Sequence, residues 1–159
     1  MLVTTIYLLV SLVLWLSVSF GTVAVKGLSM YPTLNDKDIL IASRLDIIKD
    51  VNKGDIVICH YPERGNKRFV KRVVAKEGDK IEIKEGLIFI NGKDRTASYF
   101  DEQTKFDNDY PETTVPEGTY FVIGDNVNDS EDSRMVGFID KNDIIGVVIL
   151  RIFPTVTKV

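Results

Sequence analysis

Two short segments of the sequence contain side chains that could cleave an amide bond together. The turn at residues 27–34 (GLSMYPTL) places Ser29 directly after a very apolar N-terminal stretch. A serine beside glycine and proline is usually a turn residue. Held close to a membrane, however, its hydroxyl could serve as a nucleophile if a base stood beside it. Ser29 is therefore a candidate nucleophile that needs a partner.

The candidate base lies on the segment 68–75 (RFVKRVVA), which is typical of a β-strand. Because side chains alternate faces along a strand, Lys71 shares an otherwise apolar face with Phe69 and Val73. Burial disfavours the ammonium form of lysine and lowers its pKa, and the neutral amine can act as a general base. The alternative is a lysine on an edge strand that discourages aggregation.

A third segment, at residues 124–134 (GDNVNDSEDSR), is dense in turn-forming and hydrogen-bonding residues. Its carboxylates could bind calcium, but the spacing of an EF-hand loop is absent. The chain has one histidine, His60, and one cysteine, Cys59, so a zinc site lacks ligands and an internal disulfide cannot form. A serine–histidine–aspartate triad would have to use His60. We expect neither a metal nor a cofactor.

Composition limits the class of protein that can carry these segments. The 159 residues are 45% hydrophobic and 27% charged, which is typical of a globular domain. The net charge of −3 disfavours a nucleic-acid partner.

The N-terminal stretch is predicted to be a transmembrane anchor over residues 1–25. No charged residue precedes Lys26, and residues 3–25 are long enough to span a bilayer as a helix. A cleaved signal peptide would need a basic start and a shorter apolar core. Lys26 and Lys37 weakly favour a cytoplasmic body by the positive-inside rule.

Residues 26–159 read as a mainly β, antiparallel domain. Short β-rich runs separated by turn signals occur at 38–43, 56–60, 68–75, 81–84, 87–90, 119–123 and 144–152. Residues 96–116 are polar, contain four aromatic residues and show no period. We therefore predict an excursion at about 80–116 on the rim of the sheet.

In this order, the motifs SMYPTL, KRVVAKEGD and GDNVNDSEDSR resemble the bacterial type I signal peptidases. The resemblance covers residues 23–153 and is closest to the Gram-positive-like members with one N-terminal span. It implies a membrane-bound serine endopeptidase that cleaves signal peptides from exported preproteins by a Ser/Lys dyad. It also implies a single-pass protein of the cell membrane with the catalytic domain on its extracytoplasmic side, and this overrides the weak charge-based orientation.

The resemblance assigns roles to individual residues. Ser29 matches the nucleophile, Lys71 the general base, and Ser130 the hydroxyl that orients the lysine amine. The residues that brace the site match Arg72, Asp125, Asp132 and Arg134. The apolar positions that match the substrate pockets are Val25, Met30, Leu34, Leu40, Phe69 and Val70. A serine that donates to the oxyanion in some members is replaced here by Gly27.

The expected partners are secretory preproteins, membrane lipid and, as a further partner, the protein translocation machinery. One alternative is a signal-peptidase-like factor that assembles pili without general peptidase activity. Such factors have lost the dyad, whereas Ser29 and Lys71 are both present here. The sequence does not separate a housekeeping peptidase from one dedicated to a narrow substrate set such as pilins.

Overall fold

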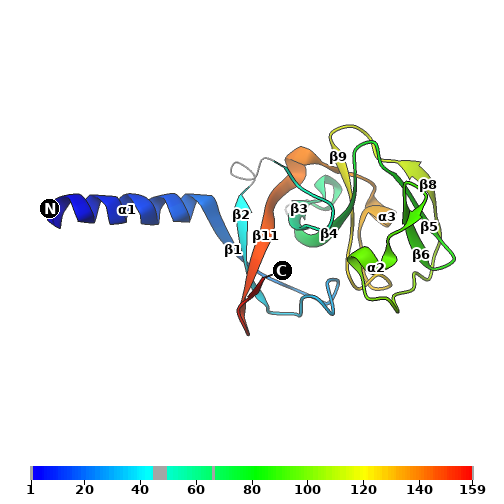
Figure 1. Cartoon of the computed structure of the whole chain (residues 1–159), viewed down its shortest axis with the longest axis horizontal. Coiled ribbons are helices and arrows are strands. Elements are labelled where there is room, and N and C mark those ends of the chain that lie inside the picture. Colours follow the sequence, from blue (N-terminus) through cyan, green and yellow to red (C-terminus); the bar gives the residue numbers. More distant parts are fainter. Residues whose placement is uncertain (1, 45–49, 66, 159) are drawn as a thin grey trace.

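The computed structural model describes residues 2–44, 50–65 and 67–158, which form an N-terminal helix and two β-sheets (Figure 1). The larger sheet contains β1 (Phe20–Ala24), β2 (Ile39–Arg44), β3 (Ile56–His60), β4 (Arg68–Lys76), β9 (Thr119–Ile123), β10 (Ile139–Asp140), β11 (Ile144–Phe153) and β12 (Thr157–Lys158). The smaller sheet contains β5 (Lys80–Lys84), β6 (Leu87–Ile90), β7 (Lys93–Asp94) and β8 (Tyr110–Thr114). The helical elements are α1 (Leu2–Ser19), α2 (Thr96–Tyr99), α3 (Ser133–Val136), η1 (Pro62–Arg64) and η2 (Lys141–Asp143).

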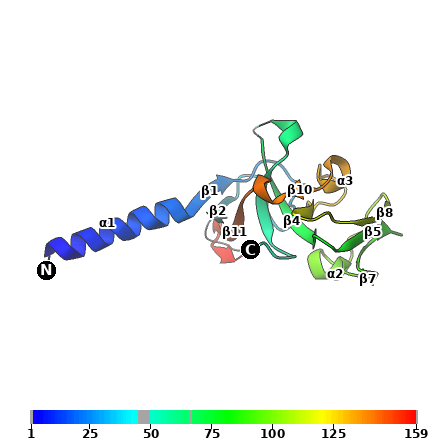
Figure 2. The same ribbon diagram turned by 90° about the horizontal axis from the view of Figure 1, so that it is seen from above.

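Every strand pair that the structure describes is antiparallel, so the predicted mainly β, antiparallel fold is confirmed. The larger sheet has the order β1-β2-β11-β3-β4-β9-β10, with β12 beside β11. The smaller sheet has the order β7-β6-β5-β8 and lies at the end of the molecule opposite α1 (Figures 1 and 2).

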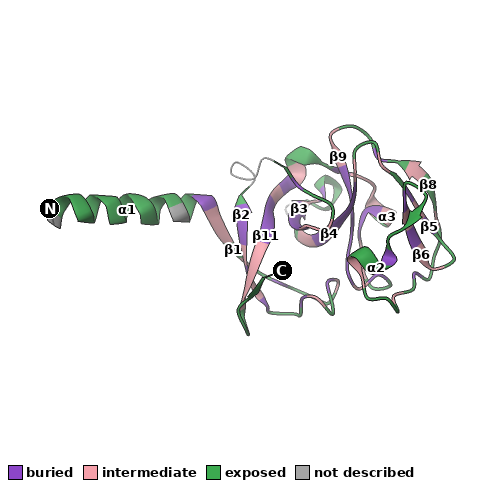
Figure 3. Cartoon of the chain, viewed as in Figure 1, coloured by how far each residue is buried: buried purple, intermediate pink, exposed green. Residues whose placement is uncertain are grey.

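The apolar N-terminal stretch divides into a helix and a strand. Helix α1 ends at Ser19 rather than at residue 25, because the next residues pair with β2 from Phe20↔Ser43 to Ala24↔Ile39. The helix projects away from the sheets, and most of its described residues are exposed (Figure 3). Within the described part of the chain, no helix has both the length and the apolar character that a membrane crossing requires.

Residues 80–116, predicted to be an excursion on the rim of the sheet, also contribute to a hydrophobic core. Strands β5, β6 and β8 cover the outer half of β4 and β9 with a shared apolar core. Aromatic residues from the loop before β8 enter this core, with Phe106 buried and its ring 5.6 Å from that of Phe100. Tyr110 stacks edge-on against Phe121 of β9 at 5.1 Å. Phe100 and Phe106 pack from irregular backbone, which explains why the sequence shows no period there.

A second core supports the turn after β1. It lies between that turn and β2, β3 and β11, and it consists of Val25, Met30, Leu34, Leu40, Ala42, Ile56, Ile58 and Val148, with Val23 and Val70 at its margin. Because residues of β1 and β4 meet in this one cluster, the larger sheet curls until its first strand approaches the start of β4. The turn that carries Ser29 is thereby seated beside β4.

Candidate active site

Lys71 is a fully buried lysine on a central strand. Its side chain is among the largest in the protein with almost no exposure, and the residue is 2% exposed. The ammonium nitrogen Nζ donates to Ser130 Oγ at 3.0 Å. Burial lowers the pKa of Lys71, while the nearby Asp132 carboxylate acts in the opposite direction. Removal from water is the larger effect, so the strand holds an amine that gives up its proton more readily than an ordinary lysine.

The turn that carries Ser29 is closed at its base by backbone hydrogen bonds. Val25 N donates to Asp38 O at 2.8 Å, and Lys37 N donates to Val25 O at 2.9 Å. Inside the turn, Gly27 N donates to Asp36 Oδ1 at 2.8 Å. Gly27 has a φ of +90°, a conformation that residues with a side chain rarely adopt. The backbone conformation at position 27 therefore favours glycine over a residue with a side chain, such as the serine that the resemblance places here in some family members.

The loop after β9 holds Ser29 by its backbone. Asn126 N donates to Ser29 O at 3.0 Å, and Asn126 Nδ2 donates to Leu28 O at 3.2 Å. A Cβ at Gly124 would stand 2.4 Å from Ser29 O and 2.2 Å from Ser130 Oγ. Ser29 and Ser130 therefore flank one glycine that has no room for a side chain. Among the described residues, the Ser29 hydroxyl itself has no hydrogen-bond partner.

Two ion pairs brace this loop. Arg72 donates to Asp125 at 2.8 and 2.6 Å, and its Nη1 donates to Gly54 O at 2.8 Å. Arg134 donates to Asp132 at 2.8 and 2.7 Å. The carboxylate side chains are 3% and 0% exposed, so each guanidinium compensates a charge that would otherwise be buried alone. The four residues to which the resemblance gave a bracing role thus form two ion pairs, Arg72 with Asp125 and Arg134 with Asp132.

A groove of about 560 Å³ opens beside Ser29, between β1 and the start of β4. Four of the six predicted pocket residues line it: Val25, Met30, Phe69 and Val70. The remaining two, Leu34 and Leu40, are fully buried beneath the turn and do not line it. They belong to the core on which the turn packs. The groove also has a basic rim of Lys26, Lys67 and Arg68, which the sequence reading did not foresee.

The wall of this groove has an unused backbone edge. Strand β4 pairs with β3 from Arg68 to Arg72 but meets β9 only from Arg72 onward. Within the described residues, no strand therefore pairs with that edge of β4 at residues 68–71. Strand β1, on the other side, is the edge of the larger sheet. An extended peptide could pair with these edges as an added strand.

The comparisons with known proteins identify the family of this chain. The family model described as "Signal peptidase, peptidase S26" matches residues 1–153. Signal peptidase I of Bacillus amyloliquefaciens is 35% identical over 145 residues, which are 85% of this chain and 75% of that protein. Signal peptidase IB of Staphylococcus aureus is 34% identical over 147 residues, 82% of this chain and 76% of that protein.

The chain belongs to the signal peptidase family. The fold agrees, since the crystal structure of a signal peptidase I from Enterococcus faecalis matches with a TM-score of 0.52 at 30% identity. That match covers 63% of this chain and 97% of the other. The predicted resemblance to type I signal peptidases is confirmed. Nothing in these comparisons supports the alternative of a pilus assembly factor.

Two residues of this signal peptidase family member escaped the sequence reading. Gly124 and Asn126 flank Asp125 in the same motif, but only the charged residue was given a role. A glycine at the end of a buried strand indicates close approach of another backbone, and that signal was available. The partner of Asn126 was not predictable, because Leu28 is 98 residues away in the chain.

Cys59 and His60 lie at the end of β3, next to the strand that carries Lys71. Cys59 is fully buried, and burial raises the pKa of its thiol to about 12, so the thiol stays protonated at neutral pH. His60 Nδ1 lies 3.2 Å from Lys67 O at the end of β3. Within the described residues, no three side chains from His, Cys, Asp and Glu are grouped so that they could hold a metal ion.

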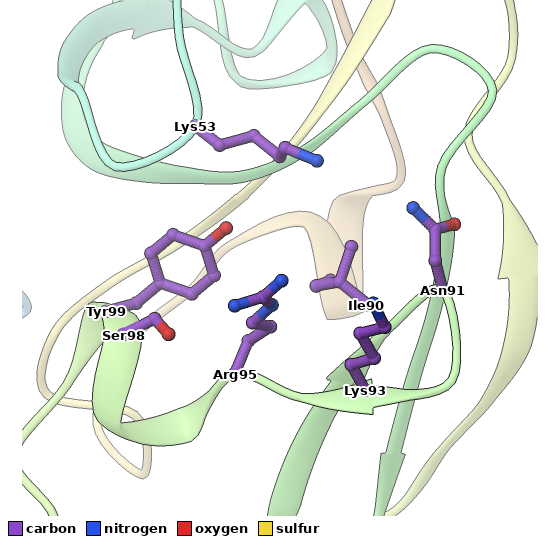
Figure 4. Close-up of a pocket in the computed structure, with 7 residues that line it drawn as sticks. All are labelled: Lys53, Ile90, Asn91, Lys93, Arg95, Ser98 and Tyr99. Carbon is purple, nitrogen blue, oxygen red and sulfur yellow. The ribbon is translucent and has the colours of Figure 1, made fainter.

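A separate hollow of about 200 Å³ lies between the smaller sheet and the loop before β3. Figure 4 shows Lys53, Arg95 and Tyr99 directed toward one space there. Lys53 is partly exposed and donates to Asp79 at 3.0 and 3.2 Å. Lys53 is thus paired with a carboxylate, whereas Lys71 is buried with a serine hydroxyl as its partner.

Proposed function

We propose that this chain is a membrane-attached serine endopeptidase that removes signal peptides from exported preproteins, with Ser29 as nucleophile and Lys71 as general base. The observation that carries the proposal is a lysine amine, buried on a central strand and hydrogen-bonded to Ser130, beside the turn of Ser29. The substrate class comes from the relatives named signal peptidase I.

The proposed reaction uses the amine of Lys71 twice. The neutral amine takes the proton of Ser29 Oγ as that oxygen attacks the scissile carbonyl carbon. The backbone N–H of Ser29 donates to the oxyanion that forms, and a donor of this kind contributes about 10²–10³ in rate. The ammonium then protonates the leaving amine as the C–N bond breaks, and water hydrolyses the acyl-enzyme. Ser130 acts by fixing the direction of the amine.

The preprotein would bind in the groove as an extended strand. Its backbone would pair with the open edge at residues 68–71, and its side chains at −1 and −3 would enter pockets formed by Met30, Phe69 and Val70. Alanine fits such pockets. A charged residue at −1 would be desolvated without a partner, and a large aromatic residue would clash.

Attachment to the membrane would use α1. The helix carries no charge, projects from the body, and leaves Leu8 and Trp15 70% and 58% exposed (Figure 2). The attachment is proposed from this exposure and lack of charge and not from the length of the helix, since no described helix meets the requirements of a membrane crossing. The catalytic body would lie on the extracytoplasmic side, where membrane lipid and the translocation machinery are its neighbours. Protease added to wall-stripped intact cells should digest the body, and protection until lysis would refute this topology.

The decisive experiment is cleavage of a signal-bearing preprotein by the full chain in detergent. Ser29→Ala and Lys71→Met should each abolish cleavage, and the double variant should be little worse because the two residues act as a unit. His60→Ala is the matched control and should keep the rate of the unaltered protein. Cleavage that survives Lys71→Met would refute the dyad.

A further inference from the structure

A second hollow, of about 240 Å³, adjoins the proposed catalytic centre at Ser130. Its walls include Asp107, Asp109, Tyr110, Ser130, Arg134 and Met135. We propose that this hollow, here called the leaving-side pocket, receives preprotein residues that follow the scissile bond and favours a basic side chain among them. The inference rests on the proposed peptidase function and adds a substrate preference to it.

The location of the leaving-side pocket follows from two neighbouring serines. Ser29 lines the groove, whereas Ser130 lines the leaving-side pocket. Ser29 O and Ser130 Oγ both lie within 2.4 Å of the point where a Cβ of Gly124 would stand. A peptide whose residue −1 occupies the groove at Ser29 must therefore continue past Ser130. The leaving-side pocket is the hollow that it meets there.

The outer wall of the leaving-side pocket comes from the loop before β8. Asp107 N donates to Asn128 Oδ1 at 3.1 Å, and Asn128 Nδ2 donates to Lys105 O at 2.9 Å. These two bonds fasten the loop to the segment that carries Ser130. The residues at 80–116 thus do more than cover the core, because they complete a wall beside the catalytic centre.

The uncompensated charge of the leaving-side pocket is negative. Asp107 and Asp109 are exposed carboxylates, and Asp109 Oδ1 accepts a bond only from the backbone N–H of Glu85 among the described residues. Arg134, the cation in the wall, is committed elsewhere. It donates twice to the buried Asp132, and its guanidinium lies 5.4 Å from the centre of the Phe106 ring.

Neighbouring side chains complete the match to a basic residue. Lys105 does not line the pocket. Met135 is 72% exposed at the pocket rim. Lysine and arginine have an apolar stem and a charged tip, so the stem can lie on Met135 while the tip meets the carboxylates. A glutamate in the same place would be repelled.

The test is a set of preproteins that carry Lys, Gln or Glu in turn at +1, +2 and +3, with alanine kept at −1 and −3. We expect kcat/KM for Lys to exceed that for Glu by about twofold to fivefold at one of these positions, the range of an exposed ion pair. The preference should shrink in high salt because exposed charges are screened.

Charge-matched variants assign the preference to the leaving-side pocket. Asp107→Asn/Asp109→Asn should bring the ratio of Lys to Glu close to one, and asparagine at 109 keeps the oxygen that accepts from Glu85. Asp107→Lys/Asp109→Asn, which leaves a positive charge in the pocket, should reverse the ratio. Glu102→Gln/Glu117→Gln removes two charges from exposed positions outside the pocket and should leave the ratio unchanged.

The outcomes separate this inference from the function on which it rests. Cleavage without a charge preference, or with a preference that survives Asp107→Asn/Asp109→Asn, would overturn the leaving-side pocket alone. Failure to cleave any preprotein would refute the peptidase, and the leaving-side pocket with it.

Discussion

Replacing Gly124 with alanine should disable the site without touching a charged or nucleophilic group. The added Cβ would stand 2.2 Å from Ser130 Oγ, 2.7 Å from Ser130 Cβ and 2.4 Å from Ser29 O. Rotation of the serine hydroxyl cannot relieve the overlap, because Cβ of the same serine is also too close. The backbone of Ser29 or of Ser130 must therefore move by about 1 Å to reach an ordinary contact distance.

The size of the effect follows from that displacement. Overpacking of this kind costs about 1–3 kcal/mol of stability, and each kcal/mol lowers the melting temperature by about 2–4 °C in a chain of this size. A shift of about 1 Å between reacting groups can cost about 10² in rate. We expect Gly124→Ala to lose about a hundredfold in kcat for preprotein cleavage while remaining folded at 25 °C.

Two other glycines are matched controls for Gly124→Ala. Gly146→Ala overlaps Ser43 O at 2.4 Å, between β11 and β2, and should lose similar stability but much less kcat. Gly21→Ala meets nothing within 4 Å and should change neither. The assays are a cleavage time course and thermal unfolding on the same samples. If Gly124→Ala kept more than a third of the kcat, the close approach of Ser29 and Ser130 would be wrong.

Three further predictions concern the lysine and the loop beside it. Cleavage should rise with pH through the lowered pKa of Lys71, because only its free amine accepts the Ser29 proton, and a flat rate profile would contradict the lysine base. The lowered pKa also affects stability. Below that pKa the buried ammonium destabilises the folded chain by its full amount, and this effect disappears as pH rises toward about 10.5. Lys71→Met should thus raise the melting temperature most at acidic and neutral pH, and an unchanged melting temperature there would show that burial carries no cost. Ser130→Ala should reduce kcat with little change in stability. Ser133→Ala should cost about 1–3 kcal/mol with a smaller change in kcat, because buried Ser133 Oγ accepts from Val122 N at 3.0 Å, and the reverse ranking would mean that the two serines were assigned wrongly.

The sequence was sufficient for the antiparallel fold and for the position of Lys71. Strand alternation placed the lysine on an apolar face, and the structure buries it. The end of α1 was not predictable, because residues 20–24 are as apolar as the helix and become a strand only by pairing with β2, a partner farther along the chain. The burial of Leu34 and Leu40 was not predictable either, because the residues that line a pocket and those of the core beneath it are apolar alike.

The loop at 124–134 shows why so many polar residues follow one strand. Asn126 holds the backbone of Ser29, Ser130 binds the amine of Lys71, and Ser133 accepts from β9. Asp132 caps α3 and accepts from the backbone at Gly124. The proposed general base on a strand and the proposed nucleophile on a turn need a third segment that fixes their relative positions. Because one loop contacts both, a change at any of its polar positions should alter the geometry of the pair and not only the stability of the chain.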